Sequence, residues 1–212
     1  MIARALTIAA ALTLTAGCSR SGEIDPSGGI TAVRTACPAV GIPAATGDIT
    51  LFSPAGARTA DAIDVAALIT NVRSTCNDTV DPIYTEVKFD VLARRTRTDG
   101  ARDVTLPYFS VVVQGGTVVT AKRVGQVVVR FAPGQARATA SATAGAYVNR
   151  AAATLPEEVR DQITRQRRAG REEAAIDPLS NPTVRTAVLR ASFEALVGFQ
   201  LTDEQLRYNA TR

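Results

Sequence analysis

Apolar and polar residues alternate along the middle of the chain, which is the pattern of β-strands with one buried face. The clearest case is the segment 84–94, which has one apolar and one charged face. Its apolar face carries Val87, Phe89, Val91 and Ala93, and its charged face carries Glu86, Lys88 and Asp90. This segment therefore predicts a strand whose apolar side packs on a core.

Further strands are predicted on both sides of this segment, at 48–52, 63–74, 104–114, 117–131, 138–147 and 193–201. The segment 63–74 places Ile63, Val65, Ala67 and Ile69 on one face with a period of two. A helix over 61–69 is an alternative, but the β-branched residues favour the strand. The segment 104–114 is apolar on both faces, as expected of a central or doubly covered strand.

Glycines and a proline mark the connections between these strands. Asp99–Gly100 and Gly115–Gly116 are typical of hairpin turns, and together they predict an antiparallel meander. Pro107 suggests a bulge or an edge position, and Gly125 suggests a bulge. Because a sheet must cover its apolar face, the expected fold is mainly β, an antiparallel Ig-like or fibronectin-like sandwich. The Ig signature of two cysteines and a tryptophan is absent, since the chain has no Trp.

A helical insertion at about 154–191 interrupts the β pattern before the last strand. We expect a helix from Pro156 to about Ala175, capped by Thr154, with Leu155, Val159 and Ile163 as its apolar stripe. Asn181 is expected to cap a second, short helix that has Pro182 at its first position. The first helix carries the candidate anion or partner contacts Arg160, Arg165, Arg167, Arg168 and Arg171. Since acidic residues interleave with these arginines, the alternative is a solvated helix with its own salt bridges.

The N-terminus has the three parts of an export signal. One Arg in the first four residues precedes an uncharged apolar run at 5–14, too short to cross a bilayer as a helix. The sequence Leu14-Thr15-Ala16-Gly17-Cys18 then resembles the lipobox of bacterial lipoproteins. This resemblance implies removal of residues 1–17 and a mature chain that starts at Cys18 with three acyl chains. It also favours the outer membrane, because Ser19 is not the Asp that commonly retains such proteins in the inner membrane.

We expect three parts in the chain. The lipobox implies that residues 1–17 are the signal, while composition and strand pattern predict that residues 18–46 hold the lipidated cysteine and a flexible tether and that residues 47–212 form a single β-rich domain. Residues 192–209 also resemble the C-terminal end of uncharacterised proteobacterial envelope lipoproteins. This second likeness covers less than a tenth of the 212 residues and implies an envelope location without a particular activity.

Two cysteines remain after Cys18. An exported chain meets an oxidising compartment, so the even pair Cys37 and Cys76 predicts a structural disulfide. Free buried thiols or a redox pair are the alternatives, although the spacing matches neither a CxxC motif nor a zinc pattern.

Composition narrows the functional classes. Histidine is absent, which removes His-based acid–base catalysis and nearly all His-ligated metal sites. The net charge is +4 with a pI near 9.3, but the charges are interspersed and the chain is exported, so nucleic acid is not expected as a partner. Glu86 and Asp90 share a strand face, but Lys88 between them favours a surface charge ladder over an acid–base dyad. Tyr84, Tyr108 and Phe109 fit the core better than a binding patch, since aromatics are few.

These observations predict a membrane-anchored periplasmic lipoprotein that is not an enzyme, with no cofactor or metal. Its expected role is that of an adaptor, assembly factor or structural component of the cell envelope, with an envelope protein as partner. The alternative is a binder of an anionic envelope polymer or ligand through an Arg-rich surface.

Overall fold

Two four-stranded sheets pack face to face in the computed structural model, which describes residues 29–30, 35–165, 167–168 and 176–211. Strand order in one sheet is β2 (Ala39–Gly41), β10 (Phe193–Phe199), β6 (Arg102–Gln114) and β7 (Val118–Phe131). In the other sheet it is β3 (Asp48–Phe52), β4 (Ile63–Asn77), β5 (Ile83–Arg95) and β8 (Arg137–Val148). Only β2 and β10 pair in parallel within these two sheets. The predicted mainly β sandwich with a helical insertion before the last strand is confirmed.

The alternating pattern of the sequence produces the core between the sheets. Val87, Phe89 and Val91 of β5 are buried, as the segment 84–94 predicts. Val65, Ala67 and Ile69 of β4 are also buried, and this segment is a strand, so its helix alternative is wrong. The inner residues of both sheets join in one hydrophobic cluster that includes Leu106, Val129, Phe131, Val197 and Phe199.

The connections differ from a simple meander. Gly115–Gly116 does form the predicted β6–β7 hairpin, and both glycines have positive φ, +62° and +76°. Asp99–Gly100, by contrast, lies in a connection that crosses from β5 in one sheet to β6 in the other, so the hairpin predicted there is wrong. The β7–β8 connection crosses in the same way. Turn chemistry is local, and it does not specify which sheet the next strand joins.

Neither the bulge predicted near Gly125 nor the bulge or edge position predicted for Pro107 is found there. The register shifts between Val112 and Val113, not near Gly125. Gly125 is instead required by a close approach, since a Cβ atom there would lie 2.5 Å from Cζ of Tyr108. Pro107 sits in a central strand at the point where β10 ends, and its carbonyl accepts a hydrogen bond from the backbone N–H of Gln200 (2.9 Å). The nitrogen and carbonyl of one strand residue point to the same side, so the missing N–H faces the end of β10 and the ladder with β7 stays intact.

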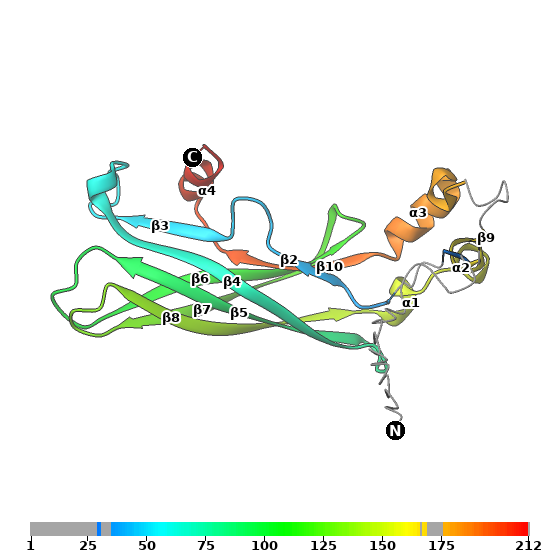
Figure 1. Ribbon diagram of the computed structural model, residues 1–212, viewed down its shortest axis with the longest axis horizontal. Coiled ribbons are helices and arrows are strands. Elements are labelled where there is room, and N and C mark those ends of the chain that lie inside the picture. The colour runs from blue at the N-terminus through cyan, green and yellow to red at the C-terminus, as the bar shows by residue number, and fades with distance from the viewer. Residues whose placement is uncertain (1–28, 31–34, 166, 169–175, 212) are drawn as a thin grey trace, which may run out of the picture.

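The long strands of the two sheets run along the long axis of the molecule, and the helices of the insertion gather at one end (Figure 1). These elements are α1 (Arg150–Ala153), α2 (Glu157–Thr164), the 3₁₀ turn η3 (Pro178–Ser180) and α3 (Pro182–Arg190). Leu155, Val159 and Ile163 form the expected apolar stripe and pack with Val184 and Ala191 in a second, smaller core. We call this end, with the connections 35–38, 78–82 and 115–117, the helical end.

Helix α2, which corresponds to the helix predicted from Pro156 to about Ala175, is shorter than predicted and starts differently. It ends at Thr164, and Arg167–Arg168 form a two-residue strand, β9, that pairs with β1 (Gly29–Ile30). Pro156 is its N-cap residue, while Thr154 closes α1 by donating its hydroxyl to the carbonyl of Arg150. The cap predicted at Asn181 is confirmed: Asn181 begins α3 and its side chain accepts a hydrogen bond from the N–H of Thr183 (2.9 Å).

The opposite end, which we call the far end, consists of the connections 53–62, 96–101 and 132–136. The first of these includes the 3₁₀ turn η1 (Ala60–Ala62). A last helix, α4 (Asp203–Thr211), follows β10 and begins with a capping box between Thr202 and Gln205. Asn209 of α4 donates to the carbonyls of Ala45 and Asp48, which holds this helix beside β3.

The folded part includes residues that the sequence assigned to the tether. Strand β2 begins at Ala39, and Cys37 is bonded to β4, so the sandwich extends to the N-terminal side of residue 47.

Candidate binding surface

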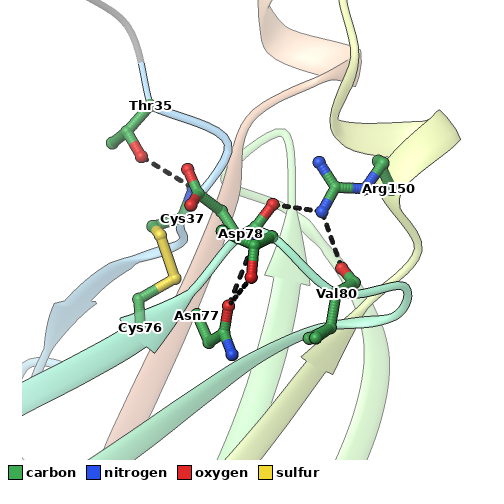
Figure 2. The surroundings of a disulfide bond; sticks show 8 residues. Thr35, Cys37, Cys76, Asn77, Asp78, Val80 and Arg150 are labelled. Carbon is green, nitrogen blue, oxygen red and sulfur yellow. Dashed lines mark hydrogen bonds between the residues drawn. A yellow bond between two sulfur atoms is a disulfide. The ribbon is translucent and has the colours of Figure 1, made fainter.

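The predicted disulfide is present and joins the two sheets. Cys37 precedes β2 in one sheet, Cys76 lies near the end of β4 in the other, and their Cα atoms are 6.1 Å apart. Figure 2 shows the bridge beside the 78–82 turn, with Arg150 pointing into that turn. The Arg150 guanidinium donates to the carbonyls of Asp78 and Val80. The Cys37–Cys76 disulfide therefore links the two sheets at the helical end of the sandwich.

The predicted arginines do not form one helical face. Arg160 lies on α2, where it pairs with Glu157 (3.6 Å) and Asp161 (3.9 Å). Arg165 is the C-cap residue of α2, and Arg167 and Arg168 belong to β9. The lipidation candidate Cys18 and Arg171 lie outside the described residues. Because α2 ends at Thr164, these arginines do not share the predicted helix, and their contact with an anion or partner stays a prediction.

A buried carboxylate is a frequent sign of a functional site, and among the described residues Asp64 of β4 is the buried carboxylate. Both of its oxygens accept hydrogen bonds from the guanidinium of Arg102 on β6 (2.7 and 2.8 Å), and Arg97 lies at 3.4 Å. The hydrogen bond from Arg102 holds the pKa of Asp64 below its usual range. This fully engaged pair joins the two sheets at the far end, so it is a structural link.

The charged side chains on the outer face of β4, β5 and β8 are largely paired. Glu86 and Lys88 form an ion pair (2.8 Å). Asp90 accepts hydrogen bonds from Asn71 (2.5 Å) and Ser141 (2.7 Å), which lower its pKa, and Arg73 lies at 3.7 Å. These contacts form the expected charge ladder.

The aromatic residues do not form a binding patch. Tyr108 packs edge-on against Phe89 in the core (5.1 Å between ring centroids), and Phe109 is buried on the opposite side of β6. Tyr84 instead lies against Tyr147 on the outer face of the other sheet (4.8 Å between centroids).

A hollow of about 550 Å³ lies on the outer face of the same sheet, toward the far end. Two rows of outward-facing residues run across the four strands and line it. The first row is Asp48, Leu68, Leu92 and Thr139, and the second row is Thr50, Ala66, Arg94 and Arg137. The second row contains the small residues Ala66 and Thr50, of which Thr50 is buried, and the volume of the hollow falls in the range of ligand sites. We call it the outer hollow.

The outer hollow has an apolar floor beside a basic corner. Leu68 and Leu92 face each other across β4 and β5 and are 49% and 47% exposed. Arg94 and Arg137 face each other across β5 and β8, and both are exposed. Neither makes a salt bridge to a carboxylate within the part of the chain that the structure describes. Like charges directly opposite in a sheet repel each other, so this corner favours an anion from outside the chain.

A second cavity, of about 70 Å³, lies between the sheets and is lined mainly by small apolar residues such as Ala144, Ala146 and Ala195. This volume holds only a few water molecules. It therefore offers no comparable room for a ligand.

Comparison of the chain with known protein families, curated proteins and solved structures finds no match. Within the described ranges, no three His, Cys, Asp or Glu side chains come together as a metal site would require. None of the helices among the described residues is long and apolar enough to cross a membrane.

The outer hollow was not predicted from the sequence, although one signal of it was present. Leu92 is an apolar residue in the charged phase of the 84–94 alternation, which marks an exposed apolar position. Its neighbours in space, Leu68, Arg94 and Arg137, come together only through the strand register.

Proposed function

We propose that this protein is a membrane-anchored lipoprotein of the cell envelope and acts there as a non-enzymatic adaptor or assembly component. The lipobox-like sequence at 14–18 carries the anchor, and several acyl chains make such an anchor effectively permanent. An envelope location also fits the Cys37–Cys76 bridge, because disulfides persist in oxidising compartments. Ser19 after the anchor residue favours the outer membrane.

We infer the orientation of the domain relative to the membrane from where the chain enters the fold. Gly29–Ile30 pairs with β9, and Cys37 is bonded at the tip of β4, so the polypeptide nearest to Cys18 enters at the helical end. An anchor at Cys18 would therefore hold the helical end toward the lipid. The outer hollow near the far end would then be accessible from the periplasm. This hollow, with its exposed leucines and arginines, is the observation that best supports an adaptor role.

Acylation of Cys18 is the first test of this proposal. The full-length chain and its Cys18→Ala variant are expressed in a Gram-negative host that is fed a labelled fatty acid. We expect label and membrane fractionation for the unchanged chain and neither for C18A. Label on both proteins, or on neither, would contradict the proposed anchor.

The adaptor role needs a partner in the envelope. Crosslinking in the intact envelope, followed by purification of the tethered protein, should recover a particular envelope protein in a way that survives moderate salt. The second candidate function, binding of an anionic envelope polymer, is favoured by Arg94 and Arg137, which make no salt bridge to any carboxylate of the described residues. Polymer binding should instead weaken steeply as salt is raised.

A further inference from the structure

We propose that the outer hollow binds an extended acidic segment of a partner protein, with an aliphatic side chain two positions away from a carboxylate. This inference deepens the proposed adaptor function by naming the chemistry of the partner and the surface that receives it.

The basic corner of the hollow recognises the carboxylate. Arg94 and Arg137 are register partners on adjacent antiparallel strands, where Cα atoms are typically about 4.5–5.5 Å apart. Two guanidinium groups at this separation can donate to one carboxylate together, and a fork of N–H groups suits its planar geometry. A bound carboxylate would also relieve the repulsion between the two arginines.

The two leucines of the first row recognise the aliphatic side chain. Leu68 and Leu92 lie about half exposed beside each other, and Ala66 next to them leaves room above the sheet. Covering these leucines removes apolar surface from water, which an anion without an apolar group would not do. The ligand must therefore combine both kinds of group.

The distance between the two rows fits an extended peptide. Leu92 and Arg94 are two residues apart on β5, a rise of about 6.6 Å along a strand. Side chains two positions apart in an extended peptide have the same separation and point the same way. A segment lying along β5 would place its aliphatic side chain over Leu68 and Leu92 and its carboxylate over Arg94 and Arg137. Because the hollow is open and lies away from the helical end, it suits a protein segment from the periplasm better than lipid.

The test uses the chain from residue 18 onward with Cys18→Ser and the disulfide intact, which contains every described residue. The probe is a five-residue peptide with blocked ends, leucine at its second position, glutamate at its fourth and serine elsewhere. Titration followed by NMR should show saturable shifts of the amides of Leu68, Leu92, Arg94 and Arg137, with a Kd on the order of 1 mM for so small a ligand.

Three altered peptides test the recognition of each group. Replacing the glutamate by glutamine, or the leucine by serine, should weaken binding at least about fivefold. Moving the leucine next to the glutamate should weaken it by a similar factor, because adjacent side chains of an extended peptide point in opposite directions. Equal binding of all four peptides would overturn the proposal.

Variants of the protein test the location. Arg94→Gln with Arg137→Gln should reduce the affinity at least about tenfold, while Arg130→Gln should leave it unchanged. Arg130 is the matched control, because it is an exposed arginine on the other sheet and pairs with Asp103 (3.5 Å). The R94Q/R137Q variant is expected to keep or slightly raise its Tm, which shows that it folds.

Shifts outside the outer hollow, or affinity unchanged in R94Q/R137Q, would overturn the proposal. So would binding to phosphatidylglycerol vesicles through Arg94 and Arg137, because it would assign this surface to lipid. The outcome is separate from the anchor test: the peptide experiment uses no acyl chain, and labelling of Cys18 involves no residue of the hollow.

Discussion

Strand β4 runs the length of the sandwich, and each of its ends is tied to the opposite sheet by a different kind of bond. At the helical end, Cys76 forms a disulfide with Cys37, which precedes β2. At the far end, Asp64 forms a bidentate ion pair with Arg102 of β6. Arg95 supports the far end as well, since its buried guanidinium donates to the carbonyls of Gln135 and Ala132 (both 2.8 Å).

The two links respond to different conditions. A disulfide stabilises the fold mainly by restricting the unfolded chain, and it does so at any pH while the bond is oxidised. The ion pair needs an ionised carboxylate, so it depends on pH and is insensitive to redox conditions. The helical end is thus held covalently near the proposed anchor, and the far end is held by charge near the outer hollow.

Removing the covalent link should have the largest effect. We expect Cys37→Ala with Cys76→Ala to lower the free energy of unfolding by about 3–4 kcal/mol, the loop-entropy value for the 39-residue separation of the pair. Urea denaturation of the chain from residue 18 onward measures it. Cys18→Ser is the control and should have no effect. A loss below about 1 kcal/mol would contradict the role of the bridge as a main link between the sheets.

Breaking the ionic link should have the next largest effect. Asp64→Asn leaves Arg102 and Arg97 without their carboxylate, and we expect a loss of about 2–3 kcal/mol. This lies below the cost for a fully buried pair because the side chain of Arg102 is 37% exposed. Asp103→Asn is the matched control, since Asp103 pairs with Arg130 at the surface and should lose less than about 0.5 kcal/mol. Similar losses in both variants would show that the far end is not held by Asp64.

Acid should remove the ionic link selectively. The pKa of Asp64 is lowered by Arg102, so its contribution to stability is full above the unfolded pKa of about 4 and is lost as pH falls through the folded pKa. The stability difference between the unchanged protein and D64N should therefore be constant from about pH 7 to 5 and shrink toward pH 2. The disulfide variant should differ from the unchanged protein by the same amount across this range. A D64N difference independent of pH would contradict this assignment.

The smallest effect is expected at the outer hollow and has the opposite sign. Arg94→Gln or Arg137→Gln removes one of two facing like charges and should raise the free energy of unfolding by a few tenths of a kcal/mol. Thermal denaturation at low salt measures the increase, which should shrink at high salt because salt screens exposed charges. A clear loss of stability in both variants would show that these arginines have partners within the chain.

Much of the local structure was predictable because its causes are local. The alternation of 84–94 follows from the period of a strand, and the cap at Asn181 satisfies backbone N–H groups of its own helix. The helix predicted from Pro156 to Ala175 failed at Thr164, since β1 from a distant part of the chain pairs with Arg167–Arg168 there. A pattern of residues over one segment contains no information about such a partner.

By itself, the sequence determined the longer strands, the sandwich class, the small apolar core of the insertion and the cysteine pair, because periodicity and cysteine count specify which faces and thiols must be removed from water. Only the tertiary structure decided which sheet each strand joins, that Asp64 meets Arg102, and that Arg94 faces Arg137 beside two exposed leucines. Those contacts depend on the register between strands and on their crossing from sheet to sheet. Register and crossing are set by the packing of the whole core, and no single segment encodes them.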